Sequence, residues 1–186
     1  MTGGIRQGGT VRKAEFAILN WIQAHLRGEF LDGFMPAFSR TADHGEIWIL
    51  SAVLLMLKKS TRRAGASVGC ALILNLISCN MLLKPLIGRL RPFALNPVEL
   101  LIPPPADAAF PSGHTAAAFA VVAALRTAGC PLWKPALILS ILMAFSRLYL
   151  YVHWPTDIAG GVVLGAAMGW LGAKIIHKVW KKAGLD

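Results

Sequence analysis

Long apolar stretches separated by short charged turns limit the possible folds of this chain more than any other feature. A helix needs about 20 mostly apolar residues to cross a bilayer, with a range near 17–25. The chain is 55% hydrophobic and only 15% charged, against about 45–50% and about 25% in a soluble domain. We therefore predict an all-α integral membrane bundle with about five to six transmembrane helices. The five candidate spans are Gly45–Leu57, Ala64–Leu83, Pro111–Leu125, Pro135–Tyr149 and Pro155–Ile176.

The N-terminal stretch Ala14–Phe38 has a different pattern, because charged residues lie among apolar ones at helical spacing. This pattern is typical of one or two amphipathic helices in the membrane interface. A sixth span here would have to bury several charges, at roughly 2.5–3.5 kcal/mol each. The sequence predicts three regions: an N-terminal interfacial segment at 1–41, a transmembrane core at 42–182 and a short cytoplasmic tail at 183–186.

Basic residues between the predicted spans indicate the topology, because cytoplasmic loops carry an excess of lysine and arginine. The loop Pro85–Phe110 and the turn Leu150–Trp154 then fall on the other side of the membrane. We predict a multi-pass protein of the cell (inner) membrane whose functional groups lie on the extracytoplasmic side. The basic residues that define the cytoplasmic side are Lys58, Lys59, Arg62, Arg63, Lys134, Lys174, Lys178, Lys181 and Lys182.

Three short blocks carry the candidate chemistry: Lys84 to Pro92, Pro111 to His114, and Ser146 to Asp157. Three cations, Lys84, Arg91 and Arg147, fall near helix ends on one face of the membrane. Clustered cations repel one another, so an anion must compensate them, and guanidinium groups grip phosphate with two parallel hydrogen bonds. The net charge of +10 could suggest nucleic acid, but no nucleic-acid partner is predicted, since the basic residues flank apolar runs.

The second block predicts the start of a helix that binds an anion. Pro111 suits the first helical position, where its missing N–H is not needed. The free N–H groups of the first turn, at Ser112, Gly113 and His114, would face the phosphate. Gly113 would let the backbone approach closely.

The third block predicts a histidine nucleophile. Asp157 follows His153 by four residues at a helix start, so its carboxylate can orient one imidazole nitrogen while the other attacks phosphorus. His114 would protonate the leaving oxygen and later activate water. The reaction would pass through a phosphohistidine, and we predict no metal and no cofactor, because the cations would stabilise the transferred phosphoryl group. A lone histidine at a helix start is usually a cap or surface residue, so the prediction depends on all three blocks together.

The three blocks resemble the signature of the type 2 phosphatidic acid phosphatase superfamily, which also contains vanadium haloperoxidases and bacterial acid phosphatases. That signature is Lys-x6-Arg-Pro, then Pro-Ser-Gly-His, then Ser-Arg-x5-His-x3-Asp, and every position matches between Lys84 and Asp157. The resemblance implies phosphate binding by Lys84, Arg91, Ser112, Gly113 and Arg147. It also implies His114 as general acid, His153 as nucleophile and Asp157 as its partner.

The predicted function is a membrane lipid phosphatase whose partners are a lipid phosphate or pyrophosphate and the membrane lipids. Undecaprenyl pyrophosphate is the leading substrate by resemblance to short bacterial enzymes, and phosphatidylglycerophosphate and phosphatidic acid are its rivals. Three alternatives remain: a lipid phosphotransferase using the same residues, a vanadium haloperoxidase, and a non-catalytic membrane transport or scaffold protein. The spans favour a lipid substrate over the haloperoxidase, and the clustered cations and histidines disfavour the scaffold.

Overall fold

The computed structural model describes residues 4–184 and consists of helices joined by turns and loops, with no strand in that range. This confirms the predicted all-α class, and each of the five apolar stretches forms a helix close to its expected bounds. The helices are α1 (Gly4–Leu26), α2 (Glu29–Arg40), α3 (Glu46–Leu57), α4 (Arg62–Asn75), η1 (Leu76–Leu83), α5 (Lys84–Ile87), α6 (Pro92–Leu95), α7 (Gly113–Thr127), α8 (Trp133–Tyr149) and α9 (Pro155–Lys182).

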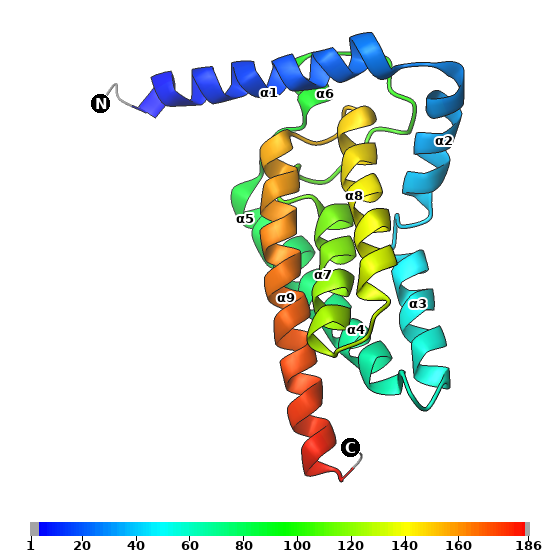
Figure 1. Cartoon of the computed structure of the whole chain (residues 1–186). Coiled ribbons are helices and arrows are strands. Elements are labelled where there is room, and N and C mark those ends of the chain that lie inside the picture. Colours follow the sequence, from blue (N-terminus) through cyan, green and yellow to red (C-terminus); the bar gives the residue numbers. More distant parts are fainter. Residues whose placement is uncertain (1–3, 185–186) are drawn as a thin grey trace.

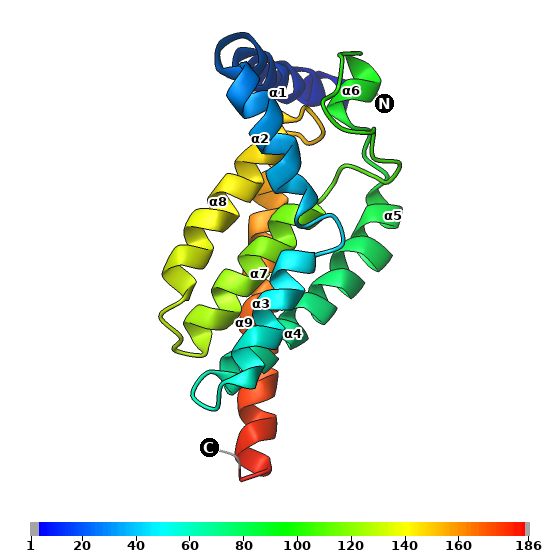
Figure 2. The same ribbon diagram turned by 90° about the vertical axis from the view of Figure 1, so that its right-hand side faces the viewer.

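Helices α3, α4, α7, α8 and α9 run side by side along one axis, and α1 lies across one end of them (Figures 1 and 2). Helix α2 turns from α1 and packs against α8. Two stretches of the described chain, Arg62–Leu95 and Pro155–Lys182, are long and apolar enough to cross a membrane. The number of spans stays a prediction.

The basic segments gather at the end of the bundle away from α1. A surface depression there is lined by Lys59 and Arg62 from the α3–α4 turn, Gly129 from the α7–α8 turn, and Trp180 from α9. Figure 1 shows the same three segments at the foot of the bundle, together with the C-terminus. The sequence predicted this grouping; which side of a membrane it faces stays a prediction.

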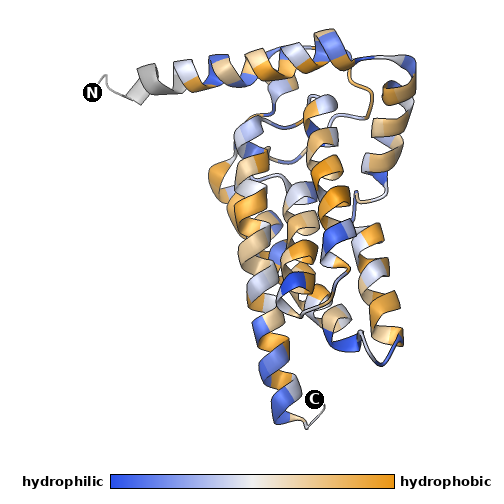
Figure 3. Cartoon of the chain, viewed as in Figure 1, coloured by the Kyte–Doolittle hydropathy of each residue, from blue (hydrophilic) through white to orange (hydrophobic). Residues whose placement is uncertain are grey.

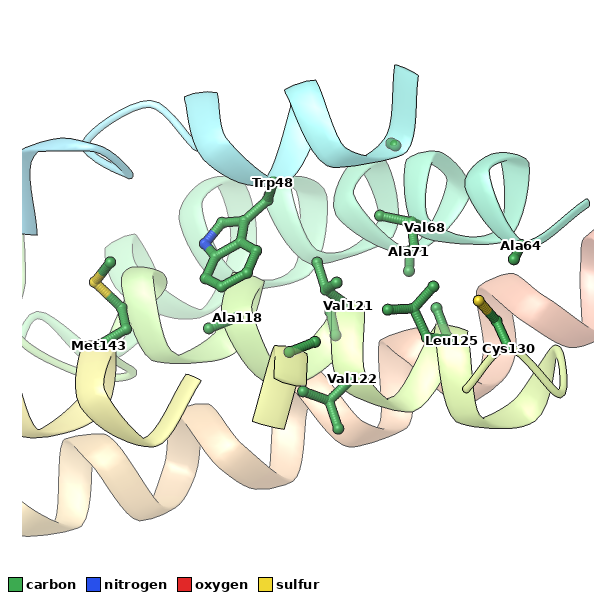
Figure 4. Close-up of a cluster of buried hydrophobic side chains, with 14 of the residues drawn as sticks. Trp48, Ala64, Val68, Ala71, Ala118, Val121, Val122, Leu125, Cys130 and Met143 are labelled. Carbon is green, nitrogen blue, oxygen red and sulfur yellow. The ribbon is translucent and has the colours of Figure 1, made fainter. Parts of the chain in front are cut away.

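A buried apolar cluster holds α3, α4, α7 and α8 together (Figure 4). Trp48 lies toward one end of the cluster, near Ala118 and Met143, and Val121 and Val68 lie further along it. The outer faces of the same helices are also apolar (Figure 3), and a bundle that is hydrophobic all round belongs in a bilayer. Exposed apolar side chains on the bundle include Leu54 and Leu57 of α3, Ile73 of α4, Met81 of η1, Ile138 of α8 and Val163 of α9.

Glycines spaced four apart let α9 approach its neighbours closely. Gly161, Gly165 and Gly169 face the backbone of α7, and Gly172 faces Ala71 of α4. A β-carbon at Gly165 would lie 2.3 Å from the carbonyl oxygen of Ala116. Small residues at this spacing are the usual means by which membrane helices pack backbone to backbone.

We expect Gly165→Ala to destabilise the bundle, because backbone atoms of α7 would have to move to admit the methyl group. Overpacking of this kind costs roughly 1–3 kcal/mol, and thermal unfolding in detergent would show it as a lower midpoint. The matched control is Gly33→Ala, since a β-carbon at Gly33 in α2 meets nothing within 4 Å. Equal midpoints for both variants would contradict the close approach of α7 and α9.

One feature of the fold was not predicted. The second span is an α-helix to Asn75 and then a π-helix over Leu76–Leu83. Such segments commonly mark functional sites, and this one ends directly before Lys84.

Candidate active site

A cavity of about 860 Å³ opens near the end of the bundle that α1 crosses. It is lined by six of the eight residues predicted from the sequence, although they come from four separate segments. The six are Lys84, Arg91, Gly113, His114, Arg147 and His153. The other two, Ser112 and Asp157, are fully buried directly behind them.

The start of α9 holds His153 in place. As predicted, the helix begins at Pro155 with Trp154 as its N-cap, and Asp157 accepts a hydrogen bond of 2.8 Å from the Trp154 N–H. The same carboxylate oxygen, Oδ2, lies 3.4 Å from Nδ1 of His153. If Nδ1 carries the proton, the lone pair of Nε2 is available on the other side of the ring.

Arg91 lies against that second nitrogen. Its Nη1 donates to the carbonyl oxygen of Val152 at 2.7 Å and lies 3.3 Å from Nε2 of His153. Burial lowers the pKa of His153 well below its ordinary value, and the positive charge of Arg91 lowers it further. The lowered pKa favours the neutral imidazole of His153, which is the form that a nucleophile requires.

An acidic residue that we did not predict joins two of the cations. The carboxylate of Asp107 forms an ion pair with Nζ of Lys84 and accepts a hydrogen bond of 2.6 Å from Nη2 of Arg91. Partial burial would raise the pKa of Asp107, but Lys84 and Arg91 outweigh it and hold that pKa below its usual value. Asp107 thus binds, as an anion, the two side chains predicted to bind phosphate.

Arg147 is compensated less completely. Arg147 is buried, with 2% of its surface exposed. Nη1 donates to the hydroxyl of Ser39, while Nε has no hydrogen-bond partner among the described residues. A buried guanidinium with an unsatisfied donor is costly, and this one lines the cavity, where an anion can reach it.

The Pro-Ser-Gly-His block forms the N-terminus of α7, with one correction. Pro111 does not occupy the first helical position: Ser112 is the N-cap, and its hydroxyl accepts from the N–H of Thr115 at 3.4 Å, so the helix begins at Gly113. A β-carbon at Gly113 would lie 3.3 Å from the side-chain oxygen of Asn80 and 3.7 Å from Nζ of Lys84. The first two blocks therefore meet at Gly113.

His114 has a carboxylate partner that we also did not predict. Its Nε2 lies 3.2 Å from Oδ1 of Asp43, in the turn between α2 and α3. This hydrogen bond lowers the pKa of Asp43 below its ordinary value. Each histidine of the site is thus paired with an aspartate, one close in sequence and one 71 residues away.

Beyond the charged end, which Arg40, Asp43 and His44 also line, the cavity becomes mostly apolar. It continues from the charged end along the groove between α3 and the helix formed by α4 and η1, where aliphatic side chains line both walls. These side chains are Ile49, Val53, Met56, Leu72, Ile73 and Leu76.

Comparisons with known proteins find relatives over most of the chain. The family model described as the PAP2 superfamily matches residues 64–181, which include all three blocks. An undecaprenyl-diphosphatase of Sulfolobus acidocaldarius is 33% identical over 163 residues, covering 86% of this chain and 76% of that protein. A lipid A 4'-phosphatase of Bacteroides thetaiotaomicron is 30% identical, covering 87% and 76%. The crystal structure of Aquifex aeolicus LpxE has a similar fold, with a TM-score of 0.73 at 24% identity, covering 87% of this chain and 95% of that chain.

Proposed function

This chain belongs to the PAP2 superfamily of lipid phosphatases, and we propose that it hydrolyses a prenyl pyrophosphate, undecaprenyl pyrophosphate, at the extracytoplasmic face of the cell membrane. The observation that carries the proposal is a single cavity with two halves. One half carries charged and polar groups, among them Lys84, Arg91, Arg147, His114 and His153, and the other is a mostly aliphatic groove between helices. A molecule with a phosphorylated head and a long hydrocarbon tail satisfies both halves.

In the proposed first step, Nε2 of His153 attacks phosphorus. The bond from phosphorus to the leaving oxygen breaks, and His114 gives that oxygen a proton. Asp157 stabilises the positive imidazole that forms, as the aspartate of a catalytic triad does. Lys84, Arg91 and Arg147 stabilise the charge on the transferred phosphoryl oxygens.

In the second step, a water molecule attacks the phosphohistidine. His114, now neutral, takes a proton from that water, the phosphorus–nitrogen bond breaks, and inorganic phosphate is released. Asp43 would stabilise the protonated form of His114 that the first step requires, because its carboxylate lies beside Nε2. The proposal involves no metal, since the transferred charge is met by side chains of this chain.

The membrane placement also belongs to the proposal. We place residues 1–41 along the interface and 42–182 in the bilayer, with the basic end of the bundle in the cytoplasm. Helix α1 supports this, because it lies across the bundle end (Figure 1) and exposes Val11, Ile18 and Trp21. Tryptophan is enriched at such interfaces.

Phosphate release from a panel of lipids tests the function. We expect purified protein, with a chelator present, to give its highest kcat/KM on undecaprenyl pyrophosphate, above phosphatidylglycerophosphate, phosphatidic acid and lipid A. A preference for a glycerol lipid would overturn the substrate but keep the reaction. Loss of activity with the chelator would contradict metal independence, and absence of phosphate release from every lipid would overturn the enzyme.

A further inference from the structure

We propose that Arg89 is a positioning residue for the His153–Asp157 pair and that it acts through Asp157, with Glu15 of α1 as its counter-ion. The inference rests on the proposed function, because it concerns how that site holds its nucleophile. Arg89 lies within the first sequence block, two residues before Arg91, yet it does not line the cavity. Its guanidinium therefore does not serve as a further phosphate ligand.

The guanidinium of Arg89 joins α1 to the start of α9. Nη1 donates to Oδ1 of Asp157 at 2.5 Å and to the hydroxyl of Thr156 at 2.6 Å. Nη2 donates to Glu15 at 2.7 Å. The guanidinium also lies over the ring of Trp154, 5.4 Å from its centroid.

The two carboxylate oxygens of Asp157 have different partners. Oδ2 lies next to the imidazole of His153 and accepts from the Trp154 N–H, while Oδ1 is held by Arg89. Asp157 has no exposed surface, and a buried carboxylate stays ionised only if a charge or hydrogen bonds compensate it. Arg89 supplies that charge and fixes the rotation of the carboxylate about its bond to the chain.

Glu15 completes the arrangement. It is 4% exposed, and its second oxygen accepts from the N–H and hydroxyl of Thr156 at 3.2 and 2.5 Å. An arginine paired with Asp157 alone would neutralise it. Because Arg89 is shared between two carboxylates, the group of three keeps a net negative charge beside His153, which suits an imidazole that becomes positive during the reaction.

This assigns a function to α1 beyond its contact with the membrane. Phe16, one residue after Glu15, packs edge-on against Trp154, with ring centroids 4.8 Å apart. Helix α1 therefore contacts α9 at the residue that caps it, and through Glu15 and Arg89 it reaches the partner of the nucleophile.

A double-mutant cycle between Arg89 and Asp157 tests the inference. We expect Arg89→Gln to lower kcat by about 10–100-fold, the range for partners that orient a reacting group, with KM nearly unchanged. Asp157→Asn should lower kcat on the order of 10³–10⁴-fold, and adding Arg89→Gln to it should lower kcat no further. Arg89→Lys should recover part of the loss, because it restores the charge but not the two-pronged geometry.

Two results would overturn the inference: additive losses in the cycle, or a loss expressed in KM alone. The charge exchange of Glu15→Arg with Arg89→Glu separates positioning from a simple attachment of α1. The exchanged pair can still join α1 to the bundle, but a carboxylate would then face Asp157, so we expect the thermal midpoint to recover and kcat to stay low. Recovery of kcat would show that Arg89 only attaches α1.

Arg126→Gln is the matched control, since Arg126 lies over Trp133 at the basic end of the bundle and should keep wild-type kcat. The Nδ1 proton resonance of His153, identified by its loss in His153→Gln, gives a readout without turnover. It should shift in Arg89→Gln and not in Arg126→Gln, and an unchanged resonance would contradict the inference. Wild-type protein inactive on every lipid would instead overturn the proposed function and leave this resonance test in force.

Discussion

His153→Gln is expected to abolish turnover, with a loss in kcat of about 10⁴-fold or more, because removal of a nucleophile from a unit that acts together costs nearly the whole rate enhancement. Glutamine keeps a polar side chain that can still donate to Asp157. The surroundings of His153, which is 1% exposed, therefore need not rearrange around an apolar gap. Phosphate release from the preferred lipid measures the loss.

The matched control is His177→Gln, which removes an exposed histidine near the far end of α9 and should leave kcat unchanged. Rapid quenching of wild-type protein with labelled substrate should trap a phosphoprotein that is labile to acid and stable to base, and His153→Gln should trap none. A variant that turns over at a rate close to wild type, or one that still traps the labelled protein, would contradict the assignment of His153.

Arg147→Gln should separate activity from stability. If Arg147 binds the phosphoryl oxygens as proposed, the variant loses those donors, and removal of such donors costs roughly 10²–10³-fold in kcat. The same change removes a buried cation whose Nε is unpartnered among the described residues and which shares the cavity with Lys84 and Arg91. Thermal unfolding without substrate should therefore show an unchanged or higher midpoint, as expected where a functional residue is kept at a cost in stability.

Arg147→Lys refines the same test. It keeps the charge but loses the planar fork, so we expect an activity between those of wild type and Arg147→Gln. Arg126→Lys, at the opposite end of the bundle, is its control. A midpoint that falls together with kcat in Arg147→Gln would show that Arg147 supports the fold, and the assignment to phosphate would then be withdrawn.

Much of the site was predictable, because its main elements are local. The spacing of His153 and Asp157 sets their geometry once α9 begins at Pro155. The alternation of apolar runs and basic turns predicted that the three blocks would meet at one end of the bundle. The predicted bounds were close for most spans, but α9 continues past the predicted Ile176 through several lysines to Lys182.

The partners of these residues were not predictable, because they come from segments distant in sequence and carry no spacing pattern. Asp43 lies 71 residues from His114, and Glu15 lies 74 residues from Arg89. Asp107 comes from an irregular loop, whose path depends on tertiary packing. The π-helix was not predicted, because the mostly apolar run Leu76–Leu83, which also contains Ser78 and Asn80, predicts a helix without predicting its pitch.

If Lys84 and Arg91 bind phosphate as proposed, their contact with Asp107 has a consequence for turnover. A phosphate that takes these two cations must replace a carboxylate already bound to them, so its measured affinity reflects an exchange between two anions rather than the full attraction of the cluster. The same exchange works in reverse after hydrolysis. When the loop carboxylate returns to Lys84 and Arg91, it competes with inorganic phosphate for the cations and speeds its departure, so a strongly basic site need not be held by its own product.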